Sequence, residues 1–99
     1  MARGFTGHEV GTSHNREHCT YRGTTVCRLD GDAGWTVLNS GGWRTVTTKR
    51  RMNQFAEHYG HNWRVFQKEF DWFIWYPDDA DLEPIPYEDG MKVCSRFGM

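Results

Sequence analysis

The chain has 99 residues, a net charge of -1 at pH 7 and a mean hydropathy of -0.78. This length suits one domain, and no apolar run approaches the roughly 20 residues that a membrane helix needs. The near-zero net charge gives no overall attraction to nucleic acid or to a membrane surface. The N-terminus lacks the apolar segment of a secretory signal, so we expect a soluble protein that stays in the cytoplasm.

The cysteines, at positions 19, 27 and 94, are an odd number at unrelated spacings. This pattern is typical of reduced thiols in a cytosol rather than of a disulfide framework, although Cys19 and Cys27 can face each other across a hairpin. The strongest metal candidate is His14-x₃-His18-Cys19, but zinc sites use tight, repeated Cys and His pairs that this sequence lacks. We therefore expect no metal and no cofactor.

Residues 1–15 are polar and aperiodic, and they predict a flexible N-terminal arm before a single α+β domain at 16–99. β-forming residues at 19–21 and 24–29 predict a hairpin with Arg22-Gly23 as its turn. The strongest turn signal in the chain covers residues 30–34, and a third strand is expected at 35–38.

A helix is expected to begin near Thr47 or Thr48, because both are good N-cap residues. Its apolar positions have the i, i+3, i+4, i+7 spacing of one buried stripe, formed by Met52, Phe55, Ala56 and Tyr59. Gly60 is well placed to end the helix.

Segments 63–67 and 72–76 predict two more strands, the second with Trp72 and Ile74 on one face and Phe73 and Trp75 on the other. Residues 82–87 are extended but confined to a sheet edge by two prolines, and 91–93 form a closing strand. The expected fold is therefore α+β, an antiparallel sheet in the order β-β-β-α-β-β-β with one helix on one face.

The segment from Ser40 to Arg51 is the strongest candidate for a binding site. The first turn of a helix favours acidic residues, because its free N–H groups carry partial positive charge. Here the expected first turn holds Lys49, Arg50 and Arg51 instead. Local violations of this kind concentrate at functional sites, and a bound anion would explain this one.

The rest of the segment fits a phosphate-bearing ligand of nucleotide size. Glycine N–H groups approach a phosphate closely, hydroxyls donate to it, arginine binds it bidentately, and tryptophan stacks on a base. Side-chain amides can read a base edge. The expected ligand-binding residues are Ser40, Gly41, Gly42, Trp43, Arg44, Thr45, Thr47, Thr48, Lys49, Arg51, Asn53 and Gln67. An ordinary strand-to-helix turn with a core Trp43 and a solvated basic face is the alternative, and it stays open.

The tract 69–89 is acidic and contains no basic residue. It is interpreted as polar loops between strands, as an oligomer or partner surface formed with an exposed aromatic face, or as a mimic of nucleic-acid phosphates. The sequence shows no arrangement of a nucleophile with a base. We therefore expect a binding protein and not an enzyme.

A resemblance adds to these observations. The run Leu38-Asn39-Ser40-Gly41-Gly42-Trp43, followed by Thr45, Thr47-Thr48-Lys49 and Arg51-Met52-Asn53-Gln54, resembles the signature of a family of small proteins carried by tailed phages and prophages. The resemblance extends over residues 21–93. It implies a phage gene product that acts inside an infected bacterium by stoichiometric binding, as small phage proteins do when they sequester nucleotide immune signals, block defence proteins or bind nucleic acid.

Three functional hypotheses follow. The leading one is a protein that captures a phosphate-bearing ligand and sequesters a nucleotide immune signal of the host, with a two-fold homo-oligomer bringing two sites together. The alternative is an inhibitor that binds a host defence or transcription protein through the acidic and aromatic surface. The third is binding of single-stranded nucleic acid, against which the near-zero net charge argues.

Overall fold

The computed structural model describes residues 4–30, 34–79 and 81–94. It contains one helix and two antiparallel sheets, so the expected α+β class is confirmed. Four expectations from the sequence fall partly outside the described residues. They are the arm at 1–15, the turn at 30–34, the acidic tract at 69–89 and the end of the domain at 16–99.

The larger sheet has five strands in the order β1-β2-β3-β4-β8. They are β1 (Thr12–His14), β2 (His18–Tyr21), β3 (Thr24–Asp30), β4 (Trp35–Leu38) and β8 (Lys92–Cys94). Strands β2 to β4 confirm the expected meander. Cys19 and Cys27 are cross-strand partners with buried, free thiols.

Strand β1 lies within the segment that we expected as an arm, and it pairs with β2. The residues before it also pack on the domain. The ring of Phe5 stacks on the imidazole of His14 with centroids 3.8 Å apart, and the Phe5 N–H donates to His58 Nδ1 at 3.2 Å. Apolar and polar contacts together therefore hold this segment against the end of the helix.

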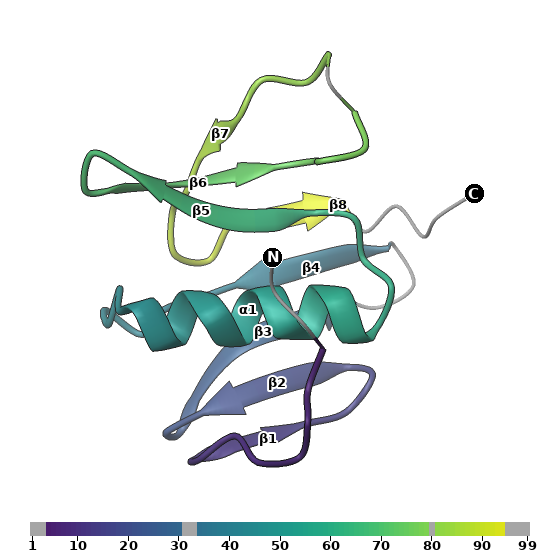
Figure 1. The fold of residues 1–99 in the computed structure, drawn as a ribbon, viewed down its shortest axis with the longest axis vertical. Helices are drawn as coiled ribbons and strands as arrows, with labels where there is room; N and C mark the ends of the chain where they lie inside the picture. Colours follow the sequence, from purple (N-terminus) through teal and green to yellow (C-terminus); the bar gives the residue numbers. More distant parts are fainter. Residues whose placement is uncertain (1–3, 31–33, 80, 95–99) are drawn as a thin grey trace.

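Helix α1 (Val46–His58) lies across the larger sheet and contacts β2 and β3 (Figure 1). Three residues of the expected stripe are fully buried: Met52, Phe55 and Ala56. Gly60 follows the helix with a φ of 77°, a conformation that glycine adopts without strain. The His61 N–H then donates to the Ala56 carbonyl at 2.8 Å, which ends the helix in a Schellman arrangement.

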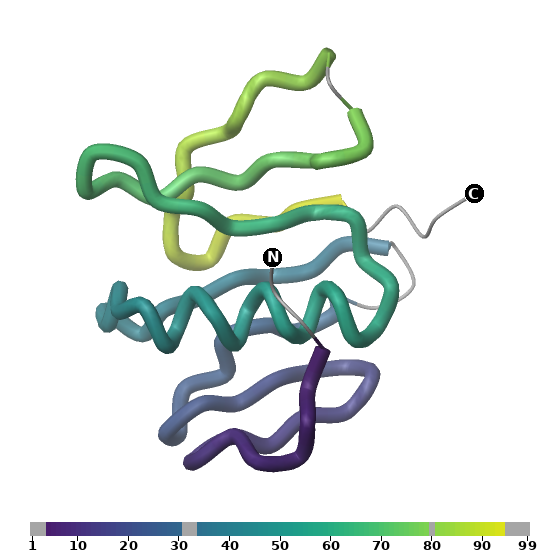
Figure 2. Tube along the Cα trace, viewed as in Figure 1, coloured from purple at the N-terminus to yellow at the C-terminus, as the bar shows by residue number. Residues whose placement is uncertain are grey.

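The smaller sheet has the order β5-β6-β7, with β5 (Arg64–Lys68), β6 (Asp71–Trp75) and β7 (Ile85–Pro86). Glu69 and Phe70 form the turn between β5 and β6 with φ values of 52° and 73°, the left-handed geometry of a two-residue hairpin loop. The tube in Figure 2 places this sheet at the opposite end of the molecule from β1, and α1 contacts its strand β5.

The single sheet that we expected is divided in two because the last strand leaves its predecessors. Strand β8 pairs with β4, in the register Trp35↔Cys94 and Val37↔Lys92. The preceding turn is bound to β4, since the Gly90 N–H donates to the Leu38 carbonyl at 2.7 Å. Strand β7 is short, and Pro86 has no N–H with which to extend its pairing.

Candidate functional site

The loop between β4 and α1 uses its own backbone donors. The Gly41 N–H donates to Asn39 Oδ1 at 2.7 Å, and the Gly42 N–H donates to Ser40 Oγ at 3.2 Å. The Trp43 N–H donates to the Ser40 carbonyl at 3.0 Å. These three N–H groups therefore stabilise the turn itself, and they are not presented to a ligand in this conformation.

Ser40 is buried and anchors the loop to the turn before β8. Its N–H and its hydroxyl both donate to Asp89 Oδ1, at 2.9 and 2.8 Å, and the Tyr87 hydroxyl donates to the same oxygen at 2.6 Å. Burial alone would raise the pKa of Asp89, but the hydrogen bonds from Tyr87 and Ser40 lower it overall. The Asp89 carboxylate thus stays ionised and fixes the loop. Arg44 lies over the Tyr87 ring, with its Cζ 5.1 Å from the centroid.

The helix begins earlier than expected, with Thr45 as its N-cap. Thr45 Oγ1 accepts the Thr48 N–H at 3.1 Å, the usual N-cap interaction. Of the three basic residues that we expected in the first turn, only Lys49 lies there, and Arg50 and Arg51 belong to the second. That premise was wrong because the cap precedes the predicted one, and it weakens the argument for an anion at the helix end.

A cavity of about 400 Å³ nevertheless lies beside this loop. It is lined by Tyr21, Arg22, Thr24, Val26, Ser40, Trp43, Thr45 and Thr48. Trp43 is 69% exposed, so the interpretation of this residue as a core side chain is wrong. We call this cavity the hairpin pocket, because the β2–β3 hairpin forms one of its walls. Four of the expected ligand-binding residues line it: Ser40, Trp43, Thr45 and Thr48.

The hairpin wall of the pocket was missed from the sequence. Tyr21, Arg22, Thr24 and Val26 come from the predicted hairpin, which carried no site in that interpretation. An aromatic residue followed by an arginine in a tight turn is a weak signal. It gains meaning only when the hairpin is known to approach the loop at Gly41.

The other expected residues have different environments. Lys49 Nζ donates to Gln67 Oε1 at 3.4 Å. Arg51 donates to Thr12 Oγ1 at 2.9 Å and lies over the Tyr21 ring, so it stands behind one wall of the pocket. Gly41, Gly42, Arg44 and Thr47 belong to the same loop and helix start but do not line the pocket.

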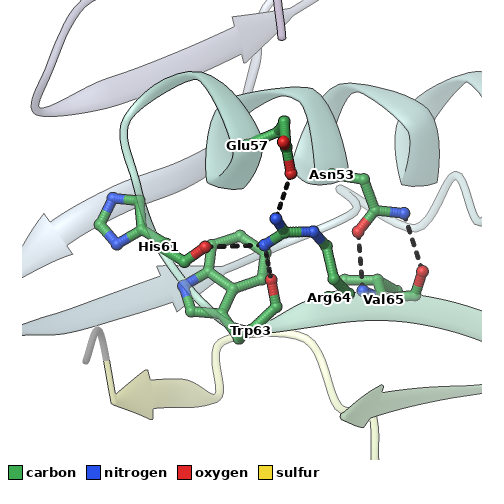
Figure 3. Close-up of polar contacts among 6 residues, drawn as sticks. All are labelled: Asn53, Glu57, His61, Trp63, Arg64 and Val65. Atoms are coloured by element: carbon green, nitrogen blue, oxygen red, sulfur yellow. Dashed lines mark hydrogen bonds and ion pairs between the residues drawn. The ribbon is translucent and has the colours of Figure 1, made fainter. Parts of the chain in front are cut away.

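Asn53 lies away from the hairpin pocket, between α1 and β5. Its amide nitrogen donates to the Val65 carbonyl at 2.8 Å, and its Oδ1 accepts the Val65 N–H at 2.7 Å (Figure 3). Both polar groups of the side chain are therefore occupied by the backbone of the smaller sheet. Asn53, Lys49 and Gln67 do not line the hairpin pocket.

One protein family matches the chain over nearly its whole length. The Kyanoviridae Gp96 protein family matches residues 3–94. The chain belongs to this family. The Gp96 family is one of phage proteins, so the phage origin that the resemblance implied is confirmed.

No curated protein and no solved structure matches this Gp96 family member. Within the described residues, no helix is long and apolar enough to cross a membrane. The same residues contain no group of three or more His, Cys, Asp or Glu side chains arranged to hold a metal ion.

Proposed function

We propose that the chain captures a phosphate-bearing small molecule, a nucleotide, in the hairpin pocket. The observation that carries the proposal is the combination of groups on its walls. Trp43, which is 69% exposed, together with Arg22, Thr24 and Thr45 lines one cavity of about 400 Å³. An aromatic face, a cation and neutral donors are what a base and a phosphate require together.

Arg22 has an unusual backbone for its residue type. Its φ is 49°, and Gly23 after it has a φ of 83°, so the two form a left-handed hairpin turn. The first position of such a turn favours Asn, Asp or Gly, and an arginine there costs about 1 kcal/mol or more. The β5–β6 turn has the same left-handed geometry, so the turn places Arg22 at the pocket without itself indicating a function.

The charge of Arg22 is available for a ligand. The two ion pairs between described side chains involve Arg64 and Lys92. Arg22 is exposed and contacts the Tyr21 ring, with its Cζ 5.6 Å from the centroid. A guanidinium that stacks on an aromatic ring keeps its N–H groups free to bind phosphate bidentately.

The N-terminus of α1 lies beside the pocket, although Thr45 already accepts the Thr48 N–H there. The pocket includes the N-cap Thr45 and the first-turn residue Thr48, so it opens at the helix N-terminus. This end carries partial positive charge and favours a nearby anion. In our proposal the base stacks on Trp43 and the phosphate lies between Arg22 and Thr45.

The chain belongs to a phage family, and we propose that it acts against the host. A binding protein made by a phage and acting in the cytoplasm of the infected cell would sequester a nucleotide immune signal stoichiometrically. Trp43 and Val46, 69% and 59% exposed, stand at this end of the molecule, and a ligand or a second copy would cover them. A two-fold oligomer is part of the proposal for this reason.

Native mass spectrometry of the protein with mono-, di- and cyclic nucleotides tests the proposal. We expect a stoichiometric adduct that Arg22→Glu weakens by about tenfold or more, because a charge-assisted contact is replaced by repulsion. Arg28→Glu is the matched control, since Arg28 is an exposed arginine of β3 outside the pocket. No adduct with any nucleotide, or equal losses in both variants, would contradict the proposal. A steep salt dependence with oligonucleotides would favour single-stranded nucleic acid instead.

A further inference from the structure

The outer face of the smaller sheet carries an aromatic cluster. Phe66 and Phe73 stack with ring centroids 5.5 Å apart, and Trp75 meets Phe66 edge-on at 6.0 Å. Trp72 and Ile74 alternate with these residues on β6, as the sequence predicted, and the structure shows that they are the buried pair. Trp75 is 40% exposed. The outer face of the β5–β6 hairpin therefore exposes aromatic side chains to solvent.

Trp75 also lines a second cavity of about 400 Å³ between the end of α1 and the loop after β6. Glu57, Asn62, Arg64, Pro77 and Asp78 contribute to the same walls. We call this cavity with the adjoining rings of Phe66 and Phe73 the Trp75 surface. It lies on the smaller sheet and does not share a lining residue with the hairpin pocket.

The one arginine on this surface is already engaged. Arg64 Nη1 donates to the carbonyls of His61 and Trp63, each at 2.7 Å, and Nη2 pairs with Glu57 (Figure 3). Asp78 adds a second carboxylate to the cavity. Burial, followed by the charge of Arg64, lowers the pKa of His61 to about 4, so this ring adds no positive charge at neutral pH.

Two features show what the cavity would accept. Asn62 Oδ1 is buried and has no hydrogen-bond partner among the described residues, and an unsatisfied acceptor is completed by a donor. The loop beyond β6 is acidic, with Asp78, Asp79, Asp81 and Glu83 and no basic residue. Acceptors, negative charge and an indole face together suit a cation that carries hydrogen-bond donors.

We propose that the Trp75 surface docks a basic segment of a partner protein, with an arginine or lysine side chain entering the cavity beside Trp75 and Asp78. Apolar side chains of the same segment pack on Phe66 and Phe73. Charge complementarity selects this occupant, because a phosphate or an acidic peptide would meet the carboxylates of the loop. The surface is distinct from the proposed nucleotide site, so each can fail without the other.

The test is fluorescence anisotropy of a labelled hexapeptide of alternating arginine and leucine, titrated with the full chain. We expect saturable binding, with no binding of the corresponding glutamate and leucine peptide. Asp78→Asn and Trp75→Ala should each lower the affinity by about tenfold. Arg22→Glu in the hairpin pocket should not lower it.

Two matched controls separate this site from general electrostatics. Glu88→Gln removes the same charge from an exposed turn, and Phe70→Ala removes an aromatic ring, 93% exposed, from the tip of the β5–β6 turn. Both should retain binding, and Trp75→Phe should retain more than Trp75→Ala. Melting curves show that each variant is folded. Absence of peptide binding, equal losses in Asp78→Asn and Glu88→Gln, or a dimer that Trp75→Ala dissociates would overturn the proposal.

Discussion

The side chain of Asn53 binds both backbone polar groups of Val65, donating to its carbonyl at 2.8 Å and accepting its N–H at 2.7 Å. Val65 lies on β5, which is an edge strand of the smaller sheet. Edge strands leave backbone groups unpaired, and here a helix residue takes the place of the next strand. This pair of bonds connects α1 to the smaller sheet.

Replacement of Asn53 should therefore destabilise the protein. Asn53→Ala leaves the N–H and the carbonyl of the buried Val65 without partners, at a cost of about 2–4 kcal/mol. Urea unfolding measures this loss. Gln67→Ala is the control, because Gln67 is exposed and should change the free energy of unfolding by only about 0.5 kcal/mol or less. Similar values for the two variants would show that the Asn53 bonds contribute little.

Gly41 gives a second prediction, because the loop approaches the hairpin closely at this point. A Cβ on Gly41 would lie 2.7 Å from Thr24 Oγ1 and 2.8 Å from Thr24 Cγ2. Gly42 also has a positive φ, 86°, but its Cβ would meet no atom within 4 Å. Gly42→Ala should cost about 1–2 kcal/mol for the left-handed backbone alone, and Gly41→Ala should cost more. Thermal melting compares them, and an equal cost would mean that the contact with Thr24 relaxes freely.

The third prediction concerns pH. His61 is buried, and its pKa is lowered from 6.5 to about 4, first by burial and then by the charge of Arg64. The unfolded chain binds a proton here at a higher pH than the folded chain does. The contribution of neutral His61 to the free energy of unfolding is therefore fully present above pH 6.5, and it is lost as the pH falls toward about 4.

Unfolding at several pH values checks this dependence. His61→Gln should flatten the fall in stability between pH 6.5 and about 4. His8→Gln, which removes an exposed histidine, should leave the slope unchanged. An unchanged slope in His61→Gln would assign the pH dependence to other groups.

Local patterns account for the parts of the fold that were predicted correctly. The stripe of Met52, Phe55 and Ala56 repeats with the helical period, and Trp72 and Ile74 alternate with Phe73 and Trp75 as a strand requires. Each pattern is contained within one element. The helix start was displaced because three threonines at 45, 47 and 48 can each act as an N-cap, and only the fold shows that Thr45 accepts the Thr48 N–H.

Contacts between distant segments account for what was not predicted. The pairing of β8 with β4 divides the sheet, and no repeating pattern in the sequence predicts this pairing. The approach of Thr24 to Gly41 creates the hairpin wall of the pocket, although the two residues belong to different predicted elements. Asn53 looked free to read a base because its bonds to Val65 join a helix to a strand that follows it.

Four of the residues that the sequence named for a binding site lie at one cavity. The sequence pointed to the loop and helix start, and Ser40, Trp43, Thr45 and Thr48 do share a cavity. The groups that could contact a ligand differ from those that the sequence predicted. Backbone donors of Gly41 and Gly42 are used within the loop, and the cation on the pocket wall is Arg22.

The most direct test of the hairpin pocket is a titration of ¹⁵N-labelled protein with the same nucleotide panel, followed by two-dimensional NMR. We expect saturable shifts of the Trp43 indole N–H and of the backbone signals of Arg22, Thr24 and Thr45, with little change on the smaller sheet. Absence of shifts across the panel, or shifts confined to residues outside the pocket, would contradict nucleotide capture at this site.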